Sequence, residues 1–191
     1  MVMERSADVP LDKEQVAAVP DSPLERAFLE DHREFTSGLD RILKALRTED
    51  DATAVELAKQ LDRAVGAHIE FEEEQFYPAL RERLGSRLVT QLYGEHATGQ
   101  RAIAGLVALE EGTRMGSDRR AELIEALERT LEHASSCGSL LSHLSALSPG
   151  CRAQLLERLR EIRRRPTRWT QRRAHRHASR AARPAPPHLG G

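Results

Sequence analysis

Hydrophobic residues recur at helical spacing along most of the chain, in stretches that short polar breaks separate. These stretches are 23–47, 53–84, 86–112 and 118–147, followed by a shorter leucine-rich one within 148–165. Ser22 and Pro23 precede the first stretch as a capping serine and a first-turn proline. Apolar positions three and four apart form one face of a helix. The pattern therefore predicts four long helices and a short fifth.

This pattern favours an all-α fold, an up-down-up-down four-helix bundle over residues 22–147, because short connections make successive helices antiparallel neighbours. Within it, Pro78 lacks a backbone donor and predicts a kink at Tyr77. The short helix within 148–165 is expected to pack on the outside of the bundle. Outside these elements, 1–21 is expected to be a flexible leader and 166–191 a disordered tail.

The net charge of −1 conceals an asymmetry. Residues 1–161 hold all 30 acidic residues and 20 of the 29 basic ones, whereas residues 162–191 hold nine arginines and no acid. An acidic body argues against nucleic acid as its main ligand, although the basic tail could attract polyanions weakly. A run of about 18 apolar residues and a signal segment are both lacking, so we expect a cytoplasmic protein that does not enter a membrane.

Each long helix carries one histidine within or beside its apolar face. These residues are His32, His68, His96 and His133. Glu72 lies four residues after His68, so on a helix the two share the buried face. A buried carboxylate needs a strong partner, and a metal ion is one such partner. Imidazoles and a carboxylate converging in a bundle suit iron, manganese or zinc, and more than four such ligands suit two metal ions.

Other interpretations of these residues require no metal ion. Glu72 could pair with an arginine such as Arg63 or Arg101, and the histidines could form a hydrogen-bonded core network. Glu73 and Glu74 are expected on a solvated face, with contact to a ligand histidine as the minority alternative. Tyr77 is most simply a packing residue. Four inward histidines with a carboxylate favour the metal over these alternatives.

Several short motifs resemble the hemerythrin-like family, also called the HHE cation-binding domain. They are Asp31-His32, the run His68–Pro78 with its HxxxEE and Tyr-Pro, Glu95-His96, and His133. The resemblance covers about residues 22–165. It implies a four-helix bundle with a non-haem di-iron centre that binds oxygen or related small molecules. The ligands it implies are His32, His68, Glu72, His96 and His133.

Cys137 departs from the family pattern, which repeats HxxxE on the fourth helix and uses that carboxylate to bridge both irons. A thiolate can bind iron, but it has one donor atom where a carboxylate has two. Cys137 is therefore either a ligand of a different kind or a small buried residue. Two weakly bound irons, a single iron, or a centre that has lost its function all remain open.

The sequence thus favours a non-haem iron protein that binds or senses O2, peroxide or nitric oxide, or handles iron, and it leaves open whether the protein is an enzyme. The competing hypothesis is a metal-free helical interaction module, with vestigial ligands and a basic tail that binds a partner. A third, nucleic-acid binding, depends on the arginine tail alone. Oligomeric state is not encoded in any of these patterns.

Overall fold

The computed structural model describes residues 22–110 and 112–172, and in these ranges every regular element is a helix. The elements are α1 (Pro23–Arg47), α2 (Asp51–Phe71), the π-helix η1 (Glu72–Phe76), α3 (Tyr77–Val107), α4 (Ser117–Ser136), the 3-10 helix η2 (Cys137–Ala146), α5 (Pro149–Arg163) and the 3-10 helix η3 (Trp169–Gln171). The all-helical prediction is confirmed for these residues. The predicted leader 1–21 and the tail beyond residue 172 lie outside them.

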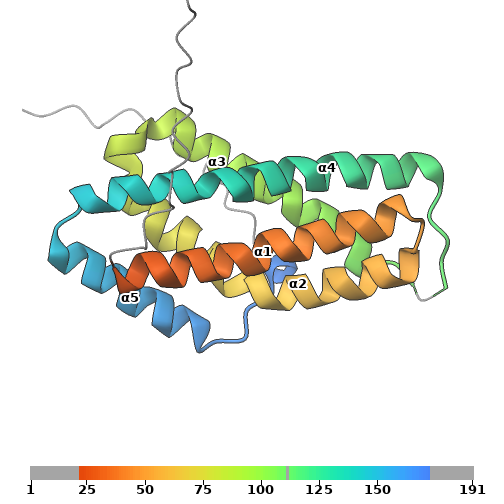
Figure 1. The fold of residues 1–191 in the computed structure, drawn as a ribbon, viewed down its shortest axis with the longest axis horizontal. Helices are drawn as coiled ribbons and strands as arrows, with labels where there is room; N and C mark the ends of the chain where they lie inside the picture. The colour runs from red at the N-terminus through yellow and green to blue at the C-terminus, as the bar shows by residue number, and fades with distance from the viewer. Residues whose placement is uncertain (1–21, 111, 173–191) are drawn as a thin grey trace, which may run out of the picture.

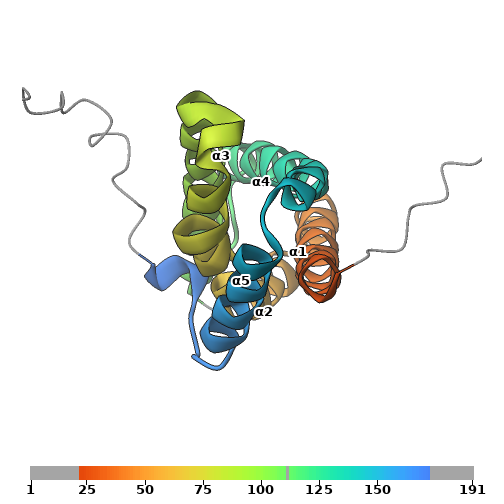
Figure 2. The ribbon, with the colours of Figure 1, turned by 90° about the vertical axis from the view of Figure 1, so that its left-hand side faces the viewer.

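Helices α1, α2, α3 and α4 lie side by side as a bundle, and α5 covers α2 at one end (Figures 1 and 2). Short connections join neighbours, with three residues between α1 and α2. No helix among the described residues combines the length and the apolar character needed to cross a bilayer. The bundle is therefore built by packing amphipathic faces against one another.

The first two helices begin at side-chain caps. The Ser22 hydroxyl accepts a hydrogen bond from the backbone N–H of Glu25, as the sequence predicts. Helix α2 begins two residues before the predicted stretch 53–84, because the Asp50 carboxylate caps it and accepts from the N–H of Thr53. An aspartate one turn earlier satisfies the same free N–H groups, so the helix begins sooner.

The passage from α2 to α3 differs from the predicted kink at Tyr77. The helix widens beforehand into the π-turn η1, in which the N–H of Tyr77 bonds to the carbonyl of Glu72, five residues back. Pro78 then falls in the first turn of α3, where its missing donor costs little. The break predicted near Gly85 is present, since Gly85 has a positive φ of 76° inside α3.

The fourth helix is shorter than the predicted 118–147. It changes at Cys137 from α-helix to the 3-10 helix η2. Serines here turn their hydroxyls onto carbonyls three residues back, as Ser136 does to His133 and Ser139 to Ser136. Such bonds compete with the α-helical ladder, and Gly138 weakens it further. The α-helix therefore stops directly after His133 and its neighbours.

The predicted disordered tail 166–191 does not hold for residues 166–172, which we call the C-terminal strap. Trp169 is 1 % exposed and meets Phe35 edge to face at 5.4 Å. The strap crosses α2 and α3. Composition predicted disorder because the segment is polar and arginine-rich, yet one large aromatic side chain buries enough area to anchor it.

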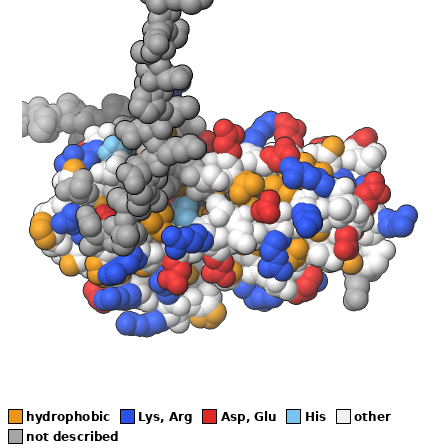
Figure 3. Space-filling view, viewed as in Figure 1, with side chains coloured by type: hydrophobic (Ala, Val, Ile, Leu, Met, Phe, Trp, Pro, Cys, Tyr) orange, Lys and Arg blue, Asp and Glu red, His pale blue; other side chains and the backbone are white. Residues whose placement is uncertain are grey.

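The face in Figure 3 carries basic and acidic side chains interspersed over the part drawn in colour, with scattered hydrophobic ones. An electrostatic surface for a polyanion needs many basic groups and few acidic ones. The coloured part of this face therefore offers a polyanion no extended basic patch.

Candidate metal centre

The four histidines lie where two apolar clusters meet inside the bundle. One cluster contains Phe35, Val65, Ile103 and Leu127 among others, and the second contains Phe28, Phe71, Leu92 and Cys137 among others. On each long helix the histidine falls between residues of the two clusters. All four are buried, with exposed fractions between 1 % and 6 %. The sequence thus folds into a polar layer enclosed between two dry ones.

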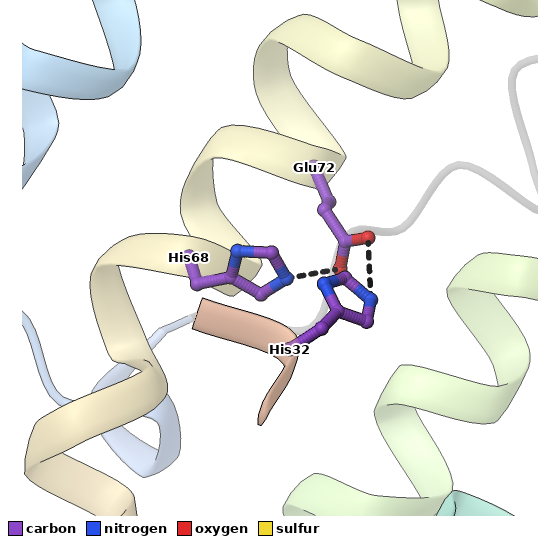
Figure 4. Close-up of side chains that lie close together, drawn as sticks. All are labelled: His32, His68 and Glu72. Atoms are coloured by element: carbon purple, nitrogen blue, oxygen red, sulfur yellow. Dashed lines mark ion pairs between the residues drawn. The ribbon is translucent and has the colours of Figure 1, made fainter. Parts of the chain in front are cut away.

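Glu72 occupies the middle of this layer. Its carboxylate oxygens lie 3.7 Å from His32 Nε2, 3.4 Å from His68 Nε2 and 3.2 Å from His96 Nε2. Figure 4 shows the carboxylate of Glu72 and the rings of His68 and His32 converging from α1 and from the α2–η1 segment. Neither oxygen, nor His68 Nε2, has a hydrogen-bond partner among the described residues. A buried carboxylate normally accepts hydrogen bonds or binds a cation, so its unsatisfied oxygens here are unusual.

The imidazoles form two pairs. His32 and His68 meet edge to face with ring centroids 4.5 Å apart, and His96 and His133 do the same at 4.8 Å. One ligand atom each from His32, His68 and Glu72 lie within 4.8 Å of one another. The structure therefore brings all four predicted histidines to one level, with Glu72 touching members of both pairs.

Each histidine is oriented by an acceptor at its outer nitrogen. His68 Nδ1 lies 3.2 Å from Asp31, His96 Nδ1 lies 3.1 Å from Glu73, and His133 Nδ1 lies 2.6 Å from Glu95. His32 Nδ1 lies 3.2 Å from the carbonyl of Phe28. An acceptor at Nδ1 holds a proton there and leaves the Nε2 lone pair free for a metal. In a neutral ring held this way, the inward Nε2 is thus available to a metal ion.

Burial and neighbouring charge set the protonation of these groups. Burial lowers the pKa of His32 from 6.5 to about 4 and also lowers that of His133. Burial acts in the same direction on His96, but contacts with the Glu72 and Glu73 carboxylates outweigh it and raise that pKa to about 9. Burial favours the neutral form of Glu72, yet the surrounding imidazoles hold its pKa well below the usual range. At neutral pH the Glu72 carboxylate therefore faces the His96 imidazolium.

Cys137 and Tyr77 complete the side of the centre near α4. Cys137 Sγ lies 3.4 Å from His133 Nε2 and 4.0 Å from the Tyr77 hydroxyl, which itself lies 3.2 Å from His96 Nε2. Burial raises the pKa of both the thiol and the phenol above their ordinary values. Without a metal, both groups are therefore protonated at neutral pH and can serve as donors.

A cavity of about 600 Å³, partly open to solvent, lies between α3 and the junction of α4 with η2. Its lining includes His133, Cys137 and Glu95, together with Leu92 and Leu140. His133 and Cys137, which are both buried, form the inner end of this cavity. It marks the direction from which a small molecule can approach the centre.

The structure corrects two readings of the acidic residues. No arginine or lysine pairs with Glu72 in the described part of the chain, so the alternative of a salt bridge to Arg63 or Arg101 is wrong. Glu73 is only 7 % exposed and contacts His96, so the minority alternative holds for it, whereas the Glu74 side chain stays 41 % exposed. The π-turn is the reason, because its wide turn directs both Glu72 and Glu73 inward.

Tyr77 is a further inward group that residue spacing alone did not reveal. It was expected to pack, and it does so with 0 % exposure, but its hydroxyl also reaches the imidazole layer. The outer acceptors Asp31 and Glu95 each precede a ligand histidine in the sequence, yet each holds the histidine of the next helix. Such adjacent acid-histidine pairs are a sequence signal for this arrangement.

The residues present fit a metal ion. Two orphaned carboxylate oxygens and an orphaned imidazole nitrogen lie buried within a set of four imidazoles, a thiol and a phenol. These donor types suit iron, manganese or zinc, and a cation would satisfy the buried oxygens. The fold and site thus define a helical bundle of the metal-binding class.

Comparison with protein-family models agrees with this class. The model of the hemerythrin HHE cation binding domain matches residues 24–135, more than half of the chain. The chain belongs to this family. Comparisons with curated proteins and with solved structures returned no match.

Proposed function

We propose that this protein holds non-haem iron in the bundle core and uses it to bind or sense a small molecule, namely O2, nitric oxide or peroxide. The observation that carries the proposal is the Glu72 carboxylate, which is buried beside inward-facing imidazoles and has no hydrogen-bond donor among residues 22–110 and 112–172. His32, His68, His96 and His133 would supply nitrogen ligands, and Glu72 would bridge the two imidazole pairs. Non-haem iron supplies reversible binding and electron transfer for such small molecules.

Side chains around the histidine layer favour the binding of a small molecule there. Phe28 stacks on His32 at 4.2 Å between ring centroids, and the two apolar clusters keep bulk water from the histidines. The Tyr77 hydroxyl lies at the edge of the layer, 3.2 Å from His96 Nε2. A proton donor beside the centre favours peroxide or oxygen reduction over simple reversible binding. The cavity at Cys137 supports entry between α3 and α4.

We infer two metal positions, one at each imidazole pair, in an up-down-up-down bundle. The compact group of His32, His68 and Glu72 supports the first position. The second depends on His96 and His133 with the Cys137 thiol or the Tyr77 phenol nearby. Because it lacks the carboxylate that the family places at residue 137, the second position should bind its metal more weakly.

Elemental analysis of the full-length protein, made in iron-rich medium without chelators, tests the proposal. We expect one to two irons per chain, and less than a tenth of that in His68→Ala, since the ligand is lost. Glu82→Gln, at an exposed position of α3, is the control and should keep its iron. A folded wild-type protein that contains no metal would favour the metal-free interaction module instead.

A further inference from the structure

The C-terminal strap binds to polar groups on the outer side of α2 and α3. The carboxylate of Asp62, which is 1 % exposed, accepts from both the N–H and the hydroxyl of Thr170, at 2.7 and 3.0 Å. The Gln100 amide donates to the carbonyls of Trp169 and Arg172, at 2.6 and 3.0 Å. Polar groups on two helices, of which Asp62 is fully buried, are thus satisfied by the strap and fix its path.

Two glycines fix the strap's distance from the bundle. A Cβ at Gly66 would lie 2.1 Å from the carbonyl oxygen of Thr167, and one at Gly99 would lie 2.6 Å from the Trp169 ring. Backbone and ring can approach this closely only where no side chain intervenes. The strap is therefore seated in a prepared groove rather than resting on the surface.

Arg172 reaches the outer carboxylates of the metal centre from this seat. Its guanidinium lies 2.8 Å from Glu70 Oε2, 3.0 Å from Glu74 Oε1 and 3.7 Å from Glu73 Oε2. The other oxygen of Glu73 is the acceptor for His96 Nδ1, at 3.1 Å. The Arg172 side chain is only 9 % exposed, so its charge acts with little screening by water.

We propose that Arg172 is a positioning residue of the centre, which orients Glu73 and thereby holds the His96 ring with Nε2 inward. The expected effect on iron binding rests on the proposed function. The orientation of Glu73 by Arg172 rests on the contacts of the strap alone. A guanidinium 3.7 Å from Oε2 attracts that oxygen and so holds the carboxylate with Oε1 toward Nδ1. A carboxylate fixed in this way sets the tautomer and orientation of a ligand histidine.

A matched pair of full-length variants tests the inference. Arg172→Gln removes the guanidinium near Glu73, whereas Arg165→Gln removes a guanidinium that pairs with Glu70 at 2.9 Å. With iron-loaded protein, we expect iron transfer to a chelator to be about three to ten times faster in Arg172→Gln, and less than twofold faster in Arg165→Gln, since outer-contact losses weaken metal sites. Equal rates in the two variants would overturn the proposal.

A second readout does not require iron. In metal-free protein the Nδ1 proton of His96 can be followed by NMR through its exchange with water. We expect exchange at least threefold faster in Arg172→Gln than in wild type or Arg165→Gln. An unchanged exchange rate in Arg172→Gln would overturn the positioning role of Arg172. A wild-type protein that takes up no iron would instead refute the proposed function, and the exchange rate would still test the role of Arg172.

Epistasis separates positioning from general stability. Glu73→Gln removes the group through which Arg172 acts, so adding Arg172→Gln to it should change the Nδ1 exchange rate by less than a further factor of two. Arg172→Lys keeps the charge but not the planar guanidinium fork, and its exchange rate should fall between those of wild type and Arg172→Gln. It also carries the test if Arg172→Gln does not fold. An additive double variant, or Arg172→Lys equal to wild type, would contradict positioning through Glu73.

Discussion

The variant Glu72→Gln separates two effects of the buried carboxylate, namely its cost to the stability of the fold and its contribution to metal binding. The side chain is 1 % exposed and neither oxygen has a hydrogen-bond partner among the described residues. Glutamine has the same shape, carries no charge and can donate to an imidazole lone pair. A buried unsatisfied polar group costs about 1–3 kcal/mol. The metal-free variant should therefore gain stability wherever the carboxylate has no charged partner.

That condition depends on pH through His96. Its pKa of about 9 in the folded protein exceeds the ordinary 6.5, so its pairing with Glu72 stabilises the fold fully below pH 6.5 and is lost as the pH rises through 9. At pH 9.5 we expect metal-free Glu72→Gln to unfold about 2–12 °C above wild type, from 1–3 kcal/mol at about 2–4 °C per kcal/mol. At pH 6 the advantage should shrink or reverse.

Iron shifts the ranking toward wild type. At a free iron concentration one hundred times Kd, binding stabilises wild type by about 2.7 kcal/mol, which corresponds to about 5–11 °C. A hundredfold weaker site in Glu72→Gln gains only about 0.4 kcal/mol, or about 1–2 °C. The assay is thermal unfolding by circular dichroism, with and without iron(II) under anaerobic conditions, and Glu82→Gln as control. Equal iron-dependent shifts in wild type and Glu72→Gln would refute the reasoning.

The remaining predictions concern proton release, Cys137 and the strap. Iron(II) binding at pH 7.5 should release about one proton from His96, which calorimetry in two buffers measures. The affinity for iron(II) should rise with pH up to about 9, and an affinity that is already constant above pH 6.5 would contradict this. Cys137→Glu restores the family carboxylate and should raise iron per chain in elemental analysis, whereas a fall would identify the thiol as a ligand. Trp169→Ala should lower the free energy of unfolding by about 3–5 kcal/mol in urea titration, and a loss below about 1 kcal/mol would show that the strap adds little to the fold.

The inward histidines could be predicted because each depends on a local pattern. His32 falls among apolar residues at helical spacing, and Glu72 lies one turn after His68, so the helical period alone directs them inward. Both expectations match the structure, where these three residues converge. Convergence of four helices at one level follows from similar lengths and short connections.

Other parts of the centre depend on contacts that no local pattern contains. Glu73 lies about 100° from Glu72 on an ordinary helix, so its inward position required the π-turn, which propensity does not encode. The strap looked disordered because its composition is polar, while its partners lie about 100 residues earlier in the chain. Asp62, Gly66 and Glu70, spaced four apart on α2, are the signal in hindsight, since two acids beside a glycine form a seat for a segment that carries donors.

The π-turn at Glu72–Phe76 makes the orientation of α3 depend on the exact number of residues in this segment. Deletion of one codon between positions 73 and 76 would convert the wide turn to an ordinary one and rotate the start of α3 by about 100° relative to His68 and Glu72. Tyr77 would then leave the imidazole layer and Glu73 would turn away from His96, while His68 and Glu72 kept their places. A change of one residue in chain length can thus remodel one side of the centre with no substitution at any of its histidines.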